Sequence, residues 1–245
     1  MLNDETKRKL RQMNIGEFID AIDLQDRDTR TMGLSFDERL QELVDSVYQE
    51  KYNNRVQRLV KSAKFRIPTA DVRDILYCPG RMLNRNLMNE LATCRFVQDY
   101  QSIIIQGYSS SGKSYLGCAL GKEACRQSYR TKYIRLPDLL VEYDDASVIK
   151  DGTKKLLRKY ASFRVLIMDE WLIADLSADE LRFLFELSER RYDTSSTIFC
   201  TLYRKEDWLD RLGESALSES IVERYSYNSI CLETGEMNMR KFLSK

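Results

Sequence analysis

A loop bracketed by two glycines, directly after an apolar run, constrains this chain more than any other feature. Residues 107–114 read GYSSSGKS and follow SIIIQ at 102–106. The pattern G-x-x-x-x-G-K-[ST] needs a buried strand before it and a helix after it, because loop N–H groups and the helix N-terminus together bind a polyphosphate. Residues 113–126 are compatible with that helix, and Gly117 and Gly121 would let it lie close to a sheet. The sequence therefore predicts a strand, a phosphate loop and a helix in succession.

Separate roles are expected within this loop. Lys113 would reach the β- and γ-phosphates, and the Ser114 hydroxyl would bind Mg²⁺. A chance loop rich in glycine and serine is the alternative that the pattern alone leaves open. ATP and Mg²⁺ are the expected cofactors, and the expected phosphate contacts come from Gly107, Tyr108, Ser109, Ser110, Ser111, Gly112, Lys113 and Ser114.

A second apolar run, VLIM at 165–168, ends in the two acids Asp169 and Glu170. A strand among apolar neighbours would hardly end in two charges unless they faced a solvated site or a cation. Asp169 is expected to hold Mg²⁺, and Glu170 to polarise the attacking water. A simple turn is the alternative for an acid pair seen alone. Together with the phosphate loop, the pair favours an ATPase over a nucleotide kinase.

The chain changes character near residue 100. Before it, apolar residues recur at helical spacing; after it, short aliphatic runs alternate with amphipathic helices. The runs are apolar on both faces, which is typical of a buried parallel sheet. We expect an α/β P-loop fold, preceded by a small all-helical N-terminal domain at 1–68, with the ATPase domain at 69–245. The predicted strands are 102–106, 132–136, 164–168, 197–201 and 229–232.

Helix starts are marked by two capping boxes, at residues 35–38 and 177–180. The first is expected to open a long helix that continues to Pro68, where helices usually stop. An earlier segment, 10–22, is interpreted as one helix or two divided near Gly16. Another helix is expected over 83–91.

The composition excludes several kinds of catalytic and metal-binding site. With no histidine, the chain has no Ser-His-Asp triad, Cys-His dyad or His-bound metal. Its six cysteines contain no Cys-x-x-Cys pair and are mostly expected in the core. No signal peptide or membrane span is evident, so we expect a reduced, cytoplasmic protein with no membrane partner. The near-neutral charge, 39 basic against 38 acidic residues, says little about partners.

The chain resembles the IstB family of transposition helper ATPases, which is related to the DnaC helicase loaders within the AAA+ class. The resemblance covers nearly the whole chain and implies an AAA+ fold with little or no C-terminal lid. It also implies ATP-dependent oligomers on double-stranded DNA and an IstA-type transposase as partner, in DNA recombination at insertion sequences. The segments that carry it are LSFDERLQELVD (34–45), ELATCRFV (90–97), GKSYLGCALGKEACRQSYR (112–130), RLPDLL (135–140), VLIMDEW (165–171), STIFCT (196–201) and EDWLDRLGE (206–214).

The resemblance implies further roles. Glu170 matches the catalytic carboxylate, and Arg224 best matches the arginine that acts on a neighbouring subunit's γ-phosphate. Arg191 competes with Arg224 for that role, and Arg240 resembles a sensor-2 arginine. Either Arg191 or Arg224 could instead be an ordinary helix arginine.

Two positions depart from the family pattern. Relatives usually carry glycine where this chain has Ser110, so the loop is expected to be stiffer. Related ATPases place Asn or Gln after the fourth strand, where this chain has Thr201 and Leu202. In those ATPases this residue, called sensor 1, orients the attacking water. Here either Thr201 takes that role or no residue does, and hydrolysis could be slow or strictly dependent on DNA.

Double-stranded DNA has a candidate site in a basic segment without acids. On a helical wheel its basic residues lie outside the apolar arc, so they could follow phosphates as a ridge. A solvated helix face is the alternative. The candidate DNA-binding residues are Lys51, Arg55, Arg58, Lys61, Lys64 and Arg66.

Two other functions stay open on the sequence. One is a DnaC-like loader of a replicative helicase that prefers single-stranded DNA. The other is an architectural protein in which ATP only licenses assembly on DNA.

Overall fold

The computed structural model describes residues 2–244 and divides the chain into two compact units, Met1–Arg58 and Leu59–Lys245. The domain boundary expected at residue 68 lies further along the chain than this division. The first unit holds α1 (Asp4–Gln12), α2 (Glu17–Gln25), the 3-10 helix η1 (Thr29–Gly33) and most of α3 (Phe36–Ala63).

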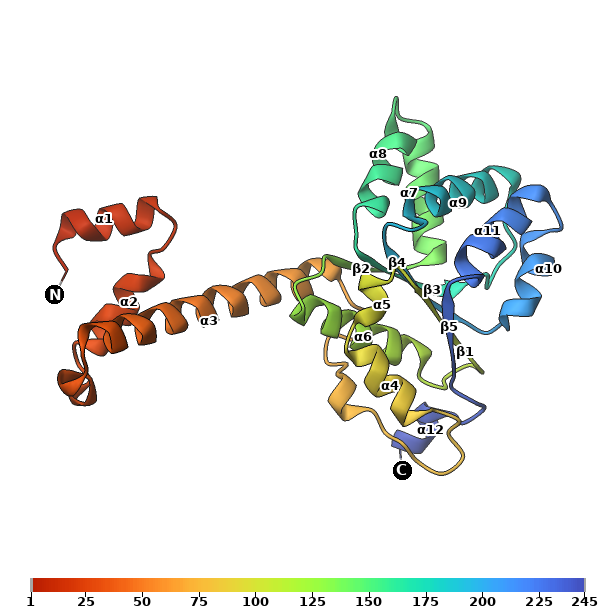
Figure 1. Cartoon of the computed structure of the whole chain (residues 1–245). Helices are drawn as coiled ribbons and strands as arrows, with labels where there is room; N and C mark the ends of the chain where they lie inside the picture. The colour runs from red at the N-terminus through yellow and green to blue at the C-terminus, as the bar shows by residue number, and fades with distance from the viewer. Residues whose placement is uncertain (1, 245) are drawn as a thin grey trace. The chain divides into compact units, whose positions relative to one another are not determined.

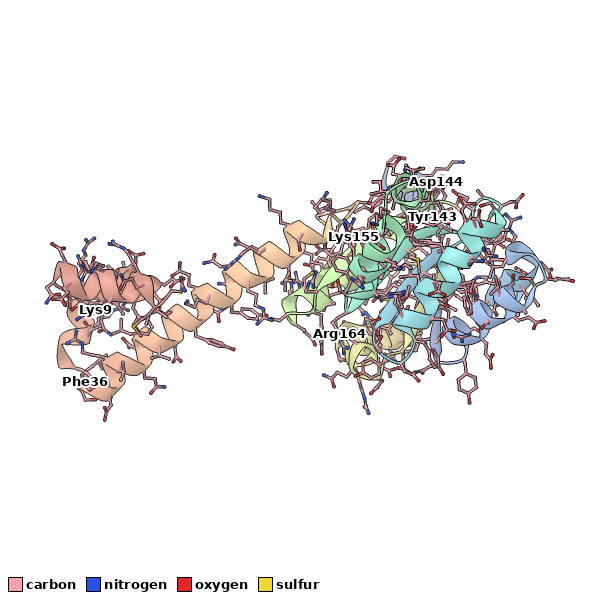
Figure 2. All side chains as sticks on the ribbon, turned by 90° about the horizontal axis from the view of Figure 1, so that it is seen from above. Lys9, Phe36, Tyr143, Asp144, Lys155 and Arg164 are labelled. Carbon is pink, nitrogen blue, oxygen red and sulfur yellow. The ribbon has the colours of Figure 1, made fainter. Side chains whose placement is uncertain are left out.

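Local signals explain where the helices of the first unit begin. Gly16 is the N-cap of α2, so the segment around it forms two helices. Before α3, the Ser35 N–H donates to Glu38 Oε2 at 2.7 Å and the Glu38 N–H donates to Ser35 Oγ at 3.3 Å. This reciprocal pair confirms the predicted capping box. Phe36, labelled in Figure 2, leads a row of exposed apolar side chains on α3 that continues with Leu40, Val44 and Tyr48.

The long helix ends earlier than the sequence predicted. It stops at Ala63, and Lys64 has a φ of +55°, so the expected continuation to Pro68 was wrong. The reason is packing: Ala63 and Phe65 are both buried, and Phe65 lies against Gly121. A left-handed residue between them turns the chain so that both enter the core of the second unit. Lys64 and Arg66 consequently do not stand on the helix that carries the other basic residues.

Five parallel strands form the sheet of the second unit, as predicted (Figure 1). Their order is β2-β3-β4-β1-β5, and every pairing is parallel. The predicted runs match them closely, except that Leu136 opens α7 and Arg164 precedes β3, so neither is in a strand. The strands are β1 (Ser102–Gln106), β2 (Thr131–Arg135), β3 (Val165–Trp171), β4 (Ser196–Thr201) and β5 (Ser229–Glu233).

Helices cover both faces of the sheet (Figure 1). One face carries η2 (Val72–Asp74), α4 (Arg85–Ala92), α5 (Arg95–Gln98) and α6 (Lys113–Arg126). The other carries α7 (Leu136–Ser147), α8 (Gly152–Ala161), α9 (Ala178–Arg191), α10 (Trp208–Leu212) and α11 (Ala216–Ser226). The short η3 (Lys205–Asp207) precedes α10, and α12 (Met239–Leu243) follows β5.

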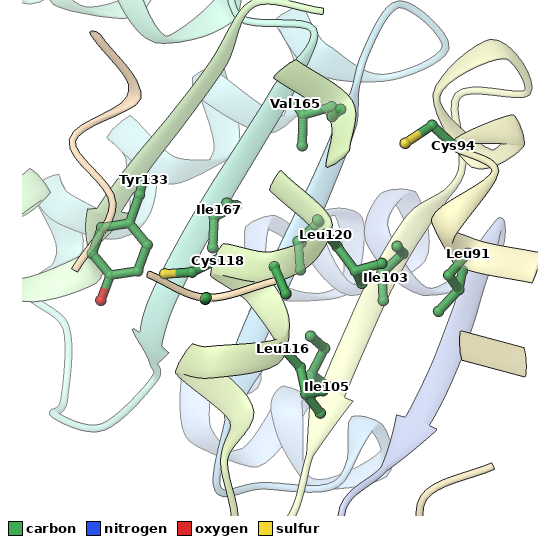
Figure 3. Packing of buried hydrophobic residues seen from close by; sticks show 14 of the residues in the cluster. Leu91, Cys94, Ile103, Ile105, Leu116, Cys118, Leu120, Tyr133, Val165 and Ile167 are labelled. Carbon is green, nitrogen blue, oxygen red and sulfur yellow. The ribbon is translucent and has the colours of Figure 1, made fainter. Parts of the chain in front are cut away.

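Each face has its own core. On the α6 face, Leu116 and Leu120 pack with Ile103, Ile105 and their neighbours (Figure 3). A Cβ added at Gly117 would lie 2.9 Å from Cys200 Sγ, and one at Gly121 would lie 2.4 Å from Ile167 Cδ1. The two glycines therefore let α6 approach the sheet, as predicted.

The opposite core is built around an aromatic group of Trp171, Phe199, Trp208 and Tyr225. Of the six cysteines, Cys94, Cys118, Cys125 and Cys200 are buried, as expected of core residues. No helix within residues 2–244 is both long and apolar enough to cross a membrane.

Candidate functional site: a nucleotide site at the carboxyl edge of the sheet

The predicted loop stands at the carboxyl edge of the sheet, between β1 and α6. Because parallel strands end on the same side, this edge also receives the residues that end β3 and follow β5. The phosphate loop at 107–114 and the acid pair at 169–170 thus come from strands that share one edge.

Glycine at the start of the loop is required by both conformation and space. Gly107 has a φ of +146°, and a Cβ there would lie 2.2 Å from Thr234 Oγ1. Ser110 has a φ of +63°, the left-handed region that glycine enters at no cost. For a serine this conformation costs about 1–2 kcal/mol, which agrees with the expectation that Ser110 makes the loop stiffer than a glycine would.

The segment after β5 braces the phosphate loop. Thr234 is fully buried, its Oγ1 lies 2.6 Å from Ser111 Oγ, and it also donates to Gln106 O at 3.1 Å. The Met239 N–H donates to Ser110 O at 2.8 Å. Sequence reasoning missed Thr234, since nothing short of the fold reveals that a residue so far along the chain holds the loop.

Lys113 lies folded into the loop. Its Nζ donates to the carbonyl oxygens of Gly107 and Tyr108, both at 2.8 Å, and burial lowers its pKa. The first N–H groups of α6 have no acceptor within the helix, so the loop presents donors and one cation together. This arrangement suits a phosphate group, which would take the ammonium from the two carbonyls.

A cavity of about 420 Å³ opens beside the loop. Its lining combines cationic groups with apolar side chains, a combination that suits the phosphates and the base of a nucleotide. Its lining includes Ile67, Leu76, Arg81, Gly112, Lys113, Ser114, Tyr115, Met239, Arg240 and Leu243. A hollow of about 500 Å³ in the first unit, lined by residues of α2, η1 and α3, has no such loop, so we place the nucleotide in the smaller cavity.

Asp169 is held in place by two hydrogen bonds. It is only 3% exposed; its Oδ2 accepts from the Tyr133 hydroxyl at 2.6 Å and its Oδ1 accepts from the Glu170 N–H at 2.9 Å. Burial, and then the hydrogen bond to Asp169, raise the pKa of Tyr133, so the phenol remains a donor. Tyr133 comes from β2 and lies on the α6 face (Figure 3). No pattern in the sequence indicated this partner.

Glu170 has a strained backbone. Its φ is +57°, and a register shift interrupts the pairing of β3 with β4 between Met168 and Trp171. A left-handed residue other than glycine costs about 1–3 kcal/mol and persists where its surroundings hold it. Here Glu170 Oε1 lies 3.0 Å from Arg66 Nη1, and Oε2 lies 3.4 Å from Arg135 Nη1.

The side chains available at this edge fit Mg²⁺ bound with a nucleotide. Ser114 and Asp169 offer oxygen ligands, which Mg²⁺ prefers, and the remaining ligands would be phosphate oxygens and water. Within residues 2–244 no cluster of three or more histidines, cysteines or acids could hold a metal alone. When bound, Mg²⁺ would neutralise phosphate charge.

Arg191 cannot act on a nucleotide bound by a neighbouring subunit. It is 1% exposed and donates to the carbonyl oxygens of Tyr160, Phe163 and Ser196 and to Thr197 Oγ1, at 2.5–3.0 Å. Burial lowers its pKa to about 10. Arg191 therefore ties α9 to β4 and to the end of α8, which is a structural role.

Arg224 occupies a different environment. It lies near the end of α11, just before β5 begins, and so at the amino edge of the sheet, opposite the phosphate loop. It pairs with Glu189 and lies over the Phe185 ring at 5.5 Å, with 24% of its side chain exposed. From the opposite edge it cannot act on the loop of its own subunit.

Two further predicted groups are placed as follows. Thr201 is buried; its Oγ1 donates to Trp171 O and accepts from the Tyr203 N–H, both at 3.1 Å, so the hydroxyl is committed to backbone. Leu202 beside it is exposed. Arg240 lines the same cavity as Lys113.

The candidate DNA-binding residues are divided between the two units. In the first, Lys51 pairs with Glu17 at 3.5 Å, whereas Arg55 and Arg58 are exposed. In the second, Lys61 and Lys64 are exposed, and Arg66 is ion-paired with Glu170. The structure thus brings Arg66 to the nucleotide site and not to a helical ridge.

The fold and this site define an ATP-binding protein of the AAA+ P-loop class. The model of the IstB-like ATP binding protein family matches residues 8–244. The chain therefore belongs to the IstB-like ATP-binding family.

Relatives agree with this assignment. One relative comes from Pseudomonas fluorescens and is named as an ATP-binding protein of insertion sequence IS1162. It is 33% identical over 199 residues, which cover 81% of this chain and 85% of the relative. The insertion-sequence protein y4uH of Sinorhizobium fredii is 26% identical and covers 98% of this chain and 96% of the relative.

Two solved structures share the fold. That of DnaI has a TM-score of 0.56 at 19% identity, covering 74% of this chain and 92% of DnaI. That of DnaA from Aquifex aeolicus, bound to AMPPCP, has a TM-score of 0.56 at 19% identity, covering 71% of this chain and 53% of DnaA.

Proposed function

We propose that this chain is an ATP-dependent helper of transposition. In this proposal it oligomerises on double-stranded target DNA, hydrolyses ATP at sites between subunits, and delivers the DNA to an IstA-type transposase or activates that enzyme. The family match over residues 8–244 carries the proposal, because the relatives it joins are named as insertion-sequence proteins.

Hydrolysis is supported by the residues at the carboxyl edge of the sheet. Lys113 and Ser114 begin the helix that follows the phosphate loop, and Asp169 and Glu170 lie on a strand ending at the same edge. We assign Mg²⁺ to Ser114 and Asp169, and activation of water to Glu170. With the Thr201 hydroxyl committed to backbone, no residue is assigned to sensor 1, so we expect slow hydrolysis that DNA accelerates.

Assembly would supply a further cation to each site. Arg224 lies at the edge of the sheet opposite its own loop, so in an oligomer it can face the γ-phosphate of the next subunit. Such an arginine raises the rate by about 10³–10⁵. Turnover would then depend on assembly, and DNA that promotes assembly would promote hydrolysis.

DNA binding is proposed for the basic residues of α3 and the segment after it. Phosphate contacts from Arg55, Arg58, Lys61 and Lys64 would position the protein without reading bases, which suits a helper that accepts many targets. Replacing any one of these residues by alanine should reduce the slope of log affinity against log salt by about 1. Binding of a duplex that stays constant between low and physiological salt would contradict this proposal.

Phosphate release with and without duplex DNA tests the enzymatic part. We expect DNA to stimulate release by the wild type, and Glu170→Gln to abolish it while keeping the ATP-bound oligomer. Turnover that survives Glu170→Gln would refute the assignment of Glu170. Oligomers seen by electron microscopy only with ATP, Mg²⁺ and duplex together would support assembly on DNA; assembly indifferent to both ATP and DNA would contradict it.

Capture of the transposase tests the partner. The IstA-type transposase should bind the protein on duplex DNA with ATP, and bind less well to Lys113→Ala under the same conditions. Equal capture of both variants would show that partnering does not use the nucleotide site.

A further inference from the structure

Arg66 lies beside both carboxylates near the end of β3. Its Nη1 is 3.0 Å from Glu170 Oε1 and 3.8 Å from Asp169 Oδ2. Hydrogen bonding to Glu170, and next to Tyr133, raises the pKa of Arg66, so it stays charged. Arg66 follows α3 and belongs to neither the phosphate loop nor the strands. A residue from outside the nucleotide motifs thus makes the shorter of the two arginine contacts to Glu170.

The contact fixes the direction of the Glu170 side chain. Arg135 ends β2, and Arg66 contacts Tyr133 of β2, so the carboxylate is held on the β2 side of β3. The sheet order places β4 and then β1, which leads into the phosphate loop, on the other side of β3. We infer that the Glu170 carboxylate is held on the side of β3 away from the loop.

The contact is also one that an anion can replace. The Arg66 side chain is 43% exposed, whereas Arg135 is bound mainly by Asp138, with 2.8 Å between Arg135 Nε and Asp138 Oδ2. Lys61 and Lys64, both exposed, precede Arg66 in the chain. A DNA phosphate drawn to this segment would compete with Glu170 for the guanidinium, because arginine binds phosphate in the same forked geometry as carboxylate.

We propose that Arg66 is a positioning residue that holds Glu170 away from the phosphate loop until a phosphate of duplex DNA takes its place. The proposal rests on the proposed function and adds the regulation of the same site. Because Arg66 keeps Glu170 away from the nucleotide, ATP turnover is low without DNA. Release of Arg66 would let Glu170 turn toward the nucleotide.

Turnover without DNA gives the first test. Arg66→Ala should raise kcat without DNA about tenfold, which corresponds to a barrier change of about 1.4 kcal/mol, and should reduce the stimulation by duplex by a similar factor. The KM for ATP should stay within about twofold, since ground-state binding is unchanged. Arg66→Lys keeps the charge, so its kcat without DNA should lie between those of the wild type and Arg66→Ala.

A control variant separates this effect from the removal of any surface ion pair. Arg95 is 79% exposed and pairs with Asp99 at 3.4 Å, at the amino edge of the sheet and so opposite the site. Arg95→Ala should leave turnover with and without DNA unchanged. If Arg66→Ala left both rates unchanged, or lowered turnover without DNA, the proposed restraint would be refuted.

A second readout avoids activity. The melting temperatures of Arg66→Ala, Glu170→Gln and the double variant, all without nucleotide, form a double-mutant cycle. Coupling predicts that the double variant shifts less than the sum of the single shifts. Additive shifts would refute the contact, whatever the rates. Coupling together with full turnover in Glu170→Gln would instead reject the proposed catalytic role of Glu170, and with it the regulation.

Discussion

The two edges of the sheet differ in how their charged side chains are bonded. At the amino edge, Arg191 is buried and bonded to four oxygen atoms of its own fold, and Arg224 pairs with Glu189. At the carboxyl edge, Lys113 is bonded to carbonyls of the loop it should serve, and Glu170 is bonded to two arginines from a strained backbone.

These two patterns distinguish structural from functional charges. The contacts of Arg191 join three elements that must pack in any state, so losing them would destabilise the fold. In the proposed function, phosphate, metal or DNA would replace the contacts of Lys113 and Glu170. Burial alone does not mark function; contacts that a ligand can exchange do. Arg224 lies between these cases, because it is partly exposed and its single carboxylate partner lies on a neighbouring helix.

Arg224 should give the greatest change in rate. If it acts on a neighbour's nucleotide, Arg224→Ala should lower turnover by about 10³ and leave nucleotide affinity unchanged. Mixing Arg224→Ala with Lys113→Ala should restore part of the activity, because mixed oligomers contain sites with an intact loop and an intact arginine. Phosphate release from the single variants and the mixture measures this. No recovery on mixing would place Arg224 with Arg191 as a structural residue.

A smaller effect, on stability, is expected at Arg191. Arg191→Met fills similar space but leaves three carbonyl oxygens and one hydroxyl without their donor. We expect a decrease of about 3 kcal/mol in the free energy of unfolding, a fall of roughly 6–12 °C in Tm for a domain of this size. The affinity of the folded protein for ATP should not change. A variant that melts like the wild type but fails in hydrolysis would overturn the structural role.

A still smaller effect, on ATP affinity, is expected when the contact between Thr234 and the phosphate loop is removed. Thr234→Val keeps the shape but removes the hydroxyl that contacts Ser111, so ATP affinity should fall about tenfold, equivalent to one net hydrogen bond. Thr234→Ser keeps the hydroxyl and should bind as the wild type does. Titration with a fluorescent ATP analogue compares them, and equal affinities for all three would show that the loop does not need the brace.

Much of the fold followed from local sequence. The loop at 107–114 and the acid pair at 169–170 are contiguous patterns whose chemistry dictates a strand before each, so both strands were predictable. The parallel sheet followed from apolar runs such as SIIIQ, which need cover on both faces. The capping box at Ser35 is equally local.

The rest depended on contacts between residues distant in the chain. Nothing local distinguishes Arg191 from Arg224, since both are helix arginines, and only burial separates them. The long helix stops at Ala63 because Phe65 packs against a helix from another part of the chain. For the same reason a helical wheel puts Arg66 on a basic ridge, although tertiary packing carries it to Glu170.

Equilibrium binding of a fluorescent ATP analogue, with Mg²⁺, to the wild type and to Lys113→Ala decides whether the loop is a nucleotide site. Lys122→Ala, on the same helix but paired with Asp71, serves as the control. We predict binding by the wild type and Lys122→Ala, and an affinity at least about 100-fold weaker, near 2.7 kcal/mol, in Lys113→Ala. Equal affinity in all three proteins, or no affinity of the wild type for adenine nucleotides, would contradict the nucleotide site.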